Sequence, residues 1–204
     1  MRNARGAAGI AALMVILLAA CGSSSHSGAS GAAASSTTPS TVKPGTPEPS
    51  PSGDIPDNQA YVAYTMPTHA FVVKVPEGWS RREVNGVVSF TDKLNTITLQ
   101  TAHQAAAPTI ASVTSNELPA IARSSPQYVA GKMSVVTRHA GSAVLATYHA
   151  DGTPNALTGK TVKLAVERYA FWRNGTEAVL TLSGPVTADN VDPWKLVTNS
   201  FAWA

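Results

Sequence analysis

The stretch that decides the fold of this chain is Arg168-Tyr169-Ala170-Phe171-Trp172-Arg173-Asn174-Gly175-Thr176-Glu177-Ala178-Val179-Leu180-Thr181-Leu182. The Asn-Gly pair at its centre is the strongest short-range signal of a β-hairpin, because a type I′ turn needs two residues that tolerate positive φ. Upstream, Val162, Leu164 and Val166 alternate with polar residues, as in a strand with one solvent-facing side. The sequence therefore predicts two long antiparallel strands joined by this turn.

Further strand patterns extend the predicted sheet in both directions. They cover residues 60–65, 71–75, 87–90, 95–100, 129–138, 143–148 and, at the end of the chain, 201–204. Within one of them Thr96, Thr98 and Gln100 alternate with larger apolar residues, which indicates that one side of this strand is wet.

Two segments have helical spacing instead. Ile110, Val113, Leu118 and Ile121 predict helix over 108–124. Because a proline inside a helix costs about 3 kcal/mol, Pro119 predicts either one helix that breaks near Leu118 or two short helices. Asp192-Pro193 indicates the N-cap and first position of a second helix. Hairpin-connected strands with two helices predict an α+β domain, an antiparallel sheet flanked by helices.

The N-terminal residues have the pattern of a targeting signal, which predicts that the protein is exported. Basic residues precede the apolar run 7–18, which is too short for a membrane span of about 20 residues. Leu18-Ala19-Ala20-Cys21 follows and resembles the lipobox of bacterial lipoproteins. That resemblance implies a diacylglyceryl group on Cys21 and cleavage between Ala20 and Cys21. The alternatives are an ordinary secretory signal, which would leave the chain's only cysteine as an exposed thiol, and a retained membrane helix, which the short run disfavours.

Composition divides the rest of the chain in two. From Gly22 to about Asp57 it is rich in Ser, Thr, Gly, Ala and Pro, and no aromatic residue precedes Tyr61. Such a segment cannot bury enough apolar surface to offset the entropy of ordering it. We therefore predict a signal peptide at 1–20, a lipidated cysteine and disordered tether at 21–57, and a globular domain at 58–204.

Charge excludes one class of partner. The formal net charge of the 204 residues is +3, and no run of Lys or Arg occurs. Nucleic-acid binding needs a clustered basic patch, so we expect no nucleic-acid partner.

Three stretches of the predicted domain resemble the PsbP-like fold, and especially LpqN-type actinobacterial lipoproteins. They are Phe71-Val72-Val73-Lys74-Val75-Pro76-Glu77-Gly78-Trp79, Arg168 to Gly175, and Trp194-Lys195-Leu196-Val197-Thr198-Asn199-Ser200-Phe201-Ala202-Trp203. The resemblance implies an antiparallel sheet flanked by helices and a binding or assembly-accessory role. It provides no catalytic residue.

No motif for chemistry stands out. His69, His103, His139 and His149 are scattered and lack metal-ligand spacing, and no Gly-x-Ser-x-Gly occurs. We therefore predict no catalytic residue, no metal site and no cofactor.

Aromatic side chains are the remaining candidates for a ligand groove. They are Trp79, Tyr169, Phe171 and Trp172, of which Tyr169 and Phe171 share one face of their strand. The alternative is that these side chains supply core volume.

Taken together, these features predict an envelope lipoprotein held on the outer face of the cell membrane through Cys21. We expect a monomeric binding or assembly-accessory module for an envelope lipid, a glycan or a protein. The alternatives are a hydrolase or transferase that acts on envelope lipid or glycan, and a single-lobe solute-binding protein.

Overall fold

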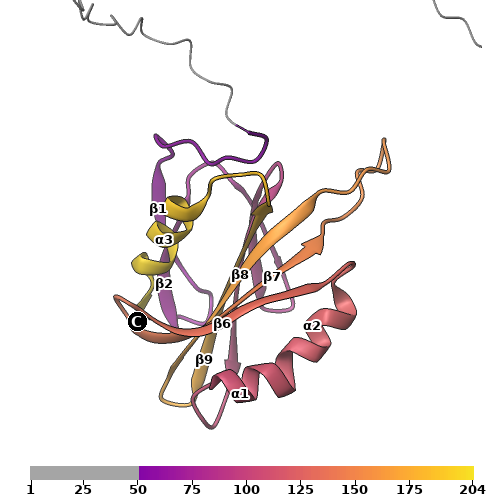
Figure 1. Ribbon diagram of the computed structural model, residues 1–204. Helices are drawn as coiled ribbons and strands as arrows, with labels where there is room; N and C mark the ends of the chain where they lie inside the picture. Colours follow the sequence, from indigo (N-terminus) through magenta and orange to yellow (C-terminus); the bar gives the residue numbers. More distant parts are fainter. Residues whose placement is uncertain (1–50) are drawn as a thin grey trace, which may run out of the picture. The chain divides into compact units, whose positions relative to one another are not determined.

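A seven-stranded antiparallel sheet forms the centre of the computed structural model, which describes residues 51–204 (Figure 1). Its strand order is β3-β4-β5-β9-β8-β7-β6. The strands are β3 (Ser80–Val84), β4 (Val87–Asp92), β5 (Asn95–His103), β6 (Val129–Arg138), β7 (Gly141–Asp151), β8 (Lys163–Arg173) and β9 (Thr176–Pro185). The predicted α+β class with an antiparallel sheet is confirmed.

The hairpin at Asn174-Gly175 joins β8 to β9. Both turn residues have positive φ, 51° at Asn174 and 81° at Gly175, and Arg173 pairs with Thr176 across the turn. β9 also pairs with β5 along its length, with Thr98 opposite Thr181 and Leu99 opposite Leu180. The hairpin predicted from sequence therefore occupies the middle of the sheet.

A second layer covers one face of this sheet. It consists of a three-stranded sheet, β1 (Tyr61–Thr65), β2 (Phe71–Pro76) and β10 (Ala202–Trp203), together with α3 (Val191–Ser200). The main core lies between the layers, where Phe171 of β8 stacks on Phe201 with ring centroids 4.3 Å apart. Leu180, Leu182 and Phe71 are fully enclosed there.

A helical segment lies on the opposite face. It comprises α1 (Ile110–Ser112), the π-helical turn η1 (Val113–Glu117) and α2 (Leu118–Ser124). Val113 packs on Val144 and Ala170, at β7 and β8. Pro119 lies in the first turn of α2, where its missing N–H is tolerated, and the π-helical turn ends just before it. The predicted break near Leu118 is thus a change of helix type within one helical segment.

The packed domain begins before the predicted boundary at Asn58. Ile55 is buried in the core, and its backbone N–H donates to Asn190 Oδ1 at 2.9 Å. The carbonyl of Gly53 accepts from Asn95 Nδ2 at 2.7 Å. Composition predicts that these residues belong to the tether, because Val42 and Ile55 are the only large apolar side chains from Gly22 to Asp57. The Ile55 side chain nevertheless fills a site between distant elements.

The start of α3 also differs from the prediction. The helix begins at Val191, so Asn190 and not Asp192 is the N-cap residue. The Asn190 side chain does not cap the helix but bonds to the segment that contains Gly53 and Ile55. A tertiary contact has therefore replaced the local capping bond.

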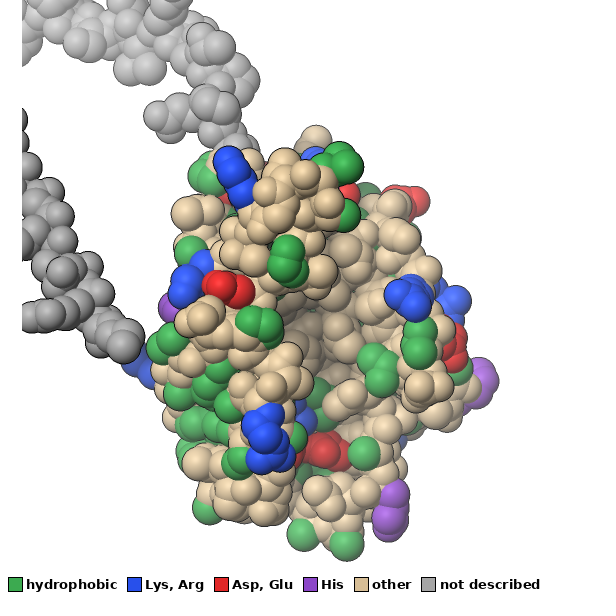
Figure 2. Space-filling view, turned by 90° about the vertical axis from the view of Figure 1, so that its right-hand side faces the viewer, with side chains coloured by type: hydrophobic (Ala, Val, Ile, Leu, Met, Phe, Trp, Pro, Cys, Tyr) green, Lys and Arg blue, Asp and Glu red, His purple; other side chains and the backbone are tan. Residues whose placement is uncertain are grey.

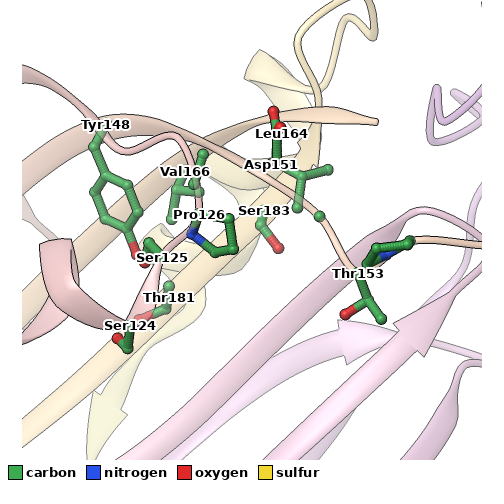
Figure 3. A pocket seen from close by; sticks show the side chains of 13 residues that line it. Ser124, Ser125, Pro126, Tyr148, Asp151, Thr153, Leu164, Val166, Thr181 and Ser183 are labelled. Atoms are coloured by element: carbon green, nitrogen blue, oxygen red, sulfur yellow. The ribbon is translucent and has the colours of Figure 1, made fainter. Parts of the chain in front are cut away.

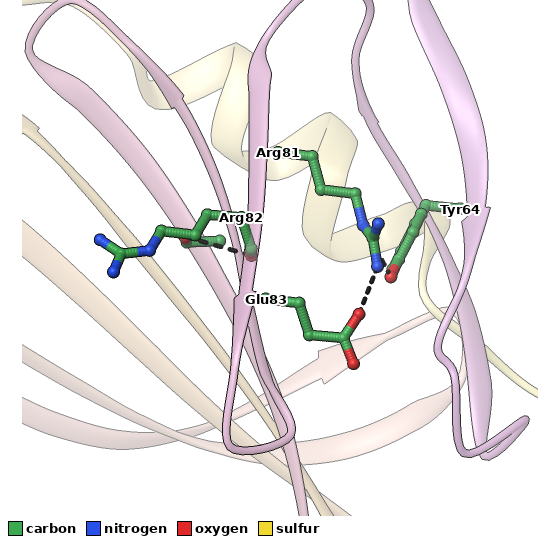
Figure 4. Close-up of polar contacts among 5 residues, drawn as sticks. Tyr64, Arg81, Arg82 and Glu83 are labelled. Atoms are coloured by element: carbon green, nitrogen blue, oxygen red, sulfur yellow. Dashed lines mark hydrogen bonds and ion pairs between the residues drawn. The ribbon is translucent and has the colours of Figure 1, made fainter.

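Strand β3 was not predicted, because its residues are all exposed and lack an apolar alternation. Arg81 of this strand reaches across to the second layer, where its Nε donates to Tyr64 Oη at 3.2 Å, and it also pairs with Glu83 (Figure 4). Tyr64 packs edge-on against Phe90, with centroids 4.9 Å apart. Arg81 thus joins the edges of the two sheets.

The predicted signal peptide, the lipobox Leu18-Ala19-Ala20-Cys21 and most of the tether lie outside the described residues. Within residues 51–204, no helix is long and apolar enough to cross a membrane.

Candidate binding groove

The helical segment covers only part of its face of the central sheet. It packs over β6, β7 and β8 and approaches Glu177 at the start of β9, whereas Thr181 and Ser183 farther along β9 are only partly buried. Hydroxyl side chains occupy this open part in facing pairs, with Thr96 opposite Ser183 and Thr98 opposite Thr181. Figure 2 shows a hollow whose floor is mostly polar side chains and backbone. The alternation in β5 correctly indicated a wet side.

A first cavity of about 470 Å³ lies at the edge of the helical cover (Figure 3). The end of α2 forms one wall, β7, β8 and β9 form the floor, and the start of the loop 152–162 forms the far wall. Its lining hydroxyls belong to Ser124, Ser125, Tyr148, Thr153, Thr181 and Ser183. Pro126, Ala150, Leu164 and Val166 supply apolar surface. The cavity therefore combines many neutral hydrogen-bonding groups with an apolar strip.

Tyr148 is the aromatic side chain of the first cavity. It packs against Tyr128 in a tilted arrangement with centroids 5.3 Å apart. Burial raises the pKa of the Tyr148 phenol, and the charge of Arg168 lowers it in part. The phenol therefore stays protonated at neutral pH and can both donate and accept a hydrogen bond.

A second cavity of about 590 Å³ adjoins the first and shares Gly152, Thr153 and Leu164 with it. It lies between the turn that joins β4 to β5 and the loop 152–162. Its charged lining residues are Lys93 and Lys160. We call the two cavities together the groove.

The loop 152–162 has internal support. Asn155 Oδ1 accepts from the backbone N–H groups of Leu157 and Thr158, at 3.0 and 2.9 Å, and the N–H of Asn155 donates to the carbonyl of Lys160 at 2.9 Å. These bonds form a compact turn whose tip exposes Leu157. The loop can therefore keep its shape as a wall of the groove through its own hydrogen bonds.

A buried charge cluster lies beside the groove. Arg168, opposite Thr181 in the sheet, pairs with Glu117 of η1, and its side chain is only 7% exposed. Burial raises the pKa of the Glu177 carboxyl, the charge of Glu117 adds to this, and Arg168 opposes it. The cluster links the helical segment to the sheet and fixes the wall to which Ser124 belongs.

The predicted groove aromatics do not line this groove. Tyr169 and Phe171 are 2% and 1% exposed and belong to the main core, because the odd-numbered residues of β8 face the second layer. Trp79 packs at the margin of that core. Trp172 is half-buried on the opposite side of β8, and its Nε1–H donates to the carbonyl of Gln104 at 2.7 Å. For Tyr169 and Phe171 the alternative prediction, that these side chains supply core volume, is the correct one.

The groove residues carried little sequence signal of their own. They come from the end of a helix, from strands β4, β5, β7, β8 and β9, and from two connecting segments, and serine and threonine supply many of their polar groups. Only the alternation in β5 indicated this face before the fold was known.

Two particular arrangements, a metal-ligand cluster and a serine–histidine pair, are absent from the described part of the chain. No group of three His, Cys, Asp or Glu residues lies close enough to hold a metal ion within residues 51–204. His69, His103, His139 and His149 lie at a turn, a strand end, a second turn and a strand. In the same region no hydrogen bond joins a serine hydroxyl to a histidine.

No family model and no curated protein matches the sequence. The solution structure of the cyanobacterial PsbP from Synechocystis sp. PCC 6803 matches with a TM-score of 0.53 and 15% identity, over 76% of this chain and 99% of that chain. The chain has a PsbP-like fold. The fold predicted from the three stretches is therefore confirmed, and the likeness to PsbP concerns the fold alone.

Two further structures are more distant. LpqN of Mycobacterium tuberculosis, described as involved in cell envelope biogenesis, has a TM-score of 0.43 and 15% identity, over 72% of this chain and 92% of that chain. A Bacteroides thetaiotaomicron protein has a TM-score of 0.45 and 9% identity over 70% of this chain, which spans about half of its length (48%). Neither likeness bears on function.

Proposed function

We propose that this chain is a binding protein of the bacterial envelope whose ligand occupies the groove. The observation that carries the proposal is the pair of adjoining cavities on the open face of the sheet, lined by hydroxyl groups beside an apolar strip. Ligand sites of this kind are concave and combine apolar surface with a few well-placed polar groups.

The groove is suited to an envelope glycan or a glycan-bearing lipid. Hydroxyl side chains both donate and accept, so Thr181, Ser183 and Tyr148 match the hydroxyls of a sugar in either sense. Leu164 and Val166 offer contact to apolar C–H surface or to an acyl chain. The positions of the floor residues are fixed by strand pairing on both sides, so little ordering entropy is lost when a ligand binds.

A lipid anchor would place this groove next to its ligand. The lipobox at Leu18-Ala19-Ala20-Cys21 supports diacylglyceryl attachment at Cys21, and two acyl chains give stable membrane attachment where one does not. We place the domain on the outer face of the cell membrane, where envelope glycans and lipids are accessible to it.

The test blocks the groove with one side chain. Thr153 is exposed and lines both cavities, so Thr153→Trp should fill the space between them. The full chain, the variant and the control Thr137→Trp, an exposed threonine of β6, are incubated with solubilised envelope glycan and with total envelope lipid. Material retained by each protein is then identified by mass spectrometry.

The proposal expects that the wild type and Thr137→Trp retain the same glycan or lipid, and that Thr153→Trp loses at least tenfold of it. Equal retention by all three proteins would place binding elsewhere and overturn the proposal. Recovery of the ligand in cleaved or transferred form would favour the hydrolase or transferase alternative.

A further inference from the structure

Two lysines from different elements line the second cavity. Lys93 lies in the turn between β4 and β5, where it adopts a φ of 50°, and Lys160 lies near the end of the loop 152–162. The positive φ is set by the two-residue turn between strands that pair up to Asp92 and Asn95. Both lysines therefore line one cavity from different elements, Lys93 from the turn and Lys160 from the loop.

No acidic side chain neutralises these lysines in the described structure. None of the residues that line the second cavity is Asp or Glu, and neither Lys93 nor Lys160 forms an ion pair within residues 51–204. The contrast with Lys163 is direct, because its Nζ lies 4.0 Å from Asp151 Oδ1 at the first cavity. The two halves of the groove thus differ in charge: the first is balanced and the second is positive.

The surroundings of the two lysines suit an anion that is attached to a larger molecule. Thr91 and Thr96 offer hydroxyl donors on the floor, and Leu94, Val162 and Leu164 add apolar surface next to them. An anionic oxygen receives charge-assisted hydrogen bonds from lysine. A free inorganic ion offers no apolar surface for these residues to contact, whereas an anion attached to a larger molecule does.

We propose that the second cavity is a binding site for an anionic group, a phosphate or carboxylate, held between Lys93 and Lys160. The inference rests on the proposed function, since it assigns a ligand class to one half of the same groove. The anion would mark one end of the ligand, and the neutral part of the ligand would extend into the first cavity past Thr153.

Three soluble probes separate the sources of the anion. Octyl phosphate carries the anion on an apolar chain, octyl glucoside carries a neutral sugar on the same chain, and inorganic phosphate is the anion alone. Each probe is titrated calorimetrically into the full chain and into Lys93→Gln, Lys160→Gln and the double variant. The two octyl compounds are kept below their critical micelle concentrations. Lys195→Gln, an exposed lysine of α3 outside the groove, is the matched control.

The wild type and the control should bind octyl phosphate more tightly than octyl glucoside. The double variant should lose about tenfold in affinity for octyl phosphate, as expected of two exposed charge contacts, and keep its affinity for octyl glucoside. Added salt should weaken only the octyl phosphate complex, since screening acts on exposed charges. If inorganic phosphate binds as tightly as octyl phosphate, the ligand is a free anion. If inorganic phosphate binds more weakly than octyl phosphate, the ligand is an anion on an apolar carrier.

Equal affinity for octyl phosphate and octyl glucoside in all variants would overturn the inference and leave the groove as a neutral site. Failure of the wild type to bind either anionic probe would also overturn it. The proposed function is judged separately, by the retention of envelope material in the Thr153→Trp experiment. Because both lysine side chains are exposed, the Gln variants should have unchanged melting temperatures, which verifies that lost affinity is not lost folding.

Discussion

Arg168 of β8 and Glu117 of η1 form an ion pair that is enclosed between the helical segment and the central sheet. Their side chains are 7% and 23% exposed. A π-helical turn contains one more residue than an α-helical turn and is frequent at functional sites. Here this turn ends at Glu117, the residue that meets the arginine. The pair therefore ties the local helix distortion to the sheet beside the groove.

Removal of Glu117 should destabilise the domain more than removal of an exposed partner. Glu117→Gln leaves the Arg168 guanidinium buried without its counter-ion, which costs about 3 kcal/mol or more. Urea unfolding of the full chain measures this loss. Glu83→Gln, which removes the exposed partner of Arg81, is the control and should leave the unfolding midpoint unchanged. A joint Glu117→Leu and Arg168→Met replacement should recover most of the stability, and a further loss would show that the pair is net stabilising.

The carboxyl of Glu177 should make the domain less stable as pH rises. Burial, with the charge of Glu117 adding to it, raises the pKa of Glu177 above its ordinary value of 4.5. The native state thus binds the proton more tightly than the unfolded state, so its stability is greatest below pH 4.5 and falls as Glu177 ionises above it. Glu177→Gln should therefore be more stable than the wild type at neutral pH, with the difference vanishing in acid. A less stable variant at neutral pH would contradict this.

Tyr169 should stabilise the domain through two charged neighbours. Its hydroxyl donates to Glu167 Oε2 at 2.6 Å and accepts from Arg138 Nη2 at 2.9 Å. Tyr169→Phe should lose about 1–3 kcal/mol, because both charged groups lose a hydrogen-bond partner. Leu145→Val, a small change in the same core, is a suitable control for packing alone.

The Tyr169 contribution should also depend on pH. Burial, with Glu167 adding to it, raises the pKa of Tyr169 to about 12 from its ordinary value of 10.0. The stabilisation is fully present below pH 10.0 and is lost between there and about pH 12. The gap in unfolding free energy between wild type and Tyr169→Phe should be constant through neutral pH and narrow in alkali. If the difference in unfolding free energy widened in alkali, the raised pKa of Tyr169 would be refuted.

Asn190 should hold the start of the domain. Its side chain accepts from the N–H of Ile55 and donates to the carbonyl of Gly53 and to Asn95 Oδ1. Asn190→Ala should cost about 3 kcal/mol, because buried partners are left unsatisfied. Limited proteolysis should cut the variant faster near residues 53–55. Asn199→Ala, on the same helix, should not change the cleavage rate.

The sequence predicted those parts of the fold that depend on local chemistry. Asn174-Gly175 specified a hairpin because few other residues tolerate its backbone angles, and the run 71–75 specified a buried strand. The division of the strands between two sheets was not predicted, because it depends on distant pairings such as Trp203 with Phe71. Strand β3 was missed because it has no buried side chain.

The groove was predicted less well than the fold. Tyr169 and Phe171 are candidates for a ligand groove because they share one face of their strand, but a second layer covers that face, and the alternative that they supply core volume is the one found. Thr181 and Ser183 face the groove from the next strand, and their small polar side chains give no distinctive signal. Only the backbone register brings them opposite Thr98 and Thr96.

The bonds to Gly53 and Ile55 also determine how the domain responds to force. A pull along the chain from residue 51 meets the hydrogen bonds to Asn95 and Asn190 before it reaches β1. β1 is an edge strand that pairs only with β2 and would be peeled away easily. The load instead enters at β5 and α3, which are anchored in the central sheet and the core, so tension applied at residue 51 would leave β1 undisturbed.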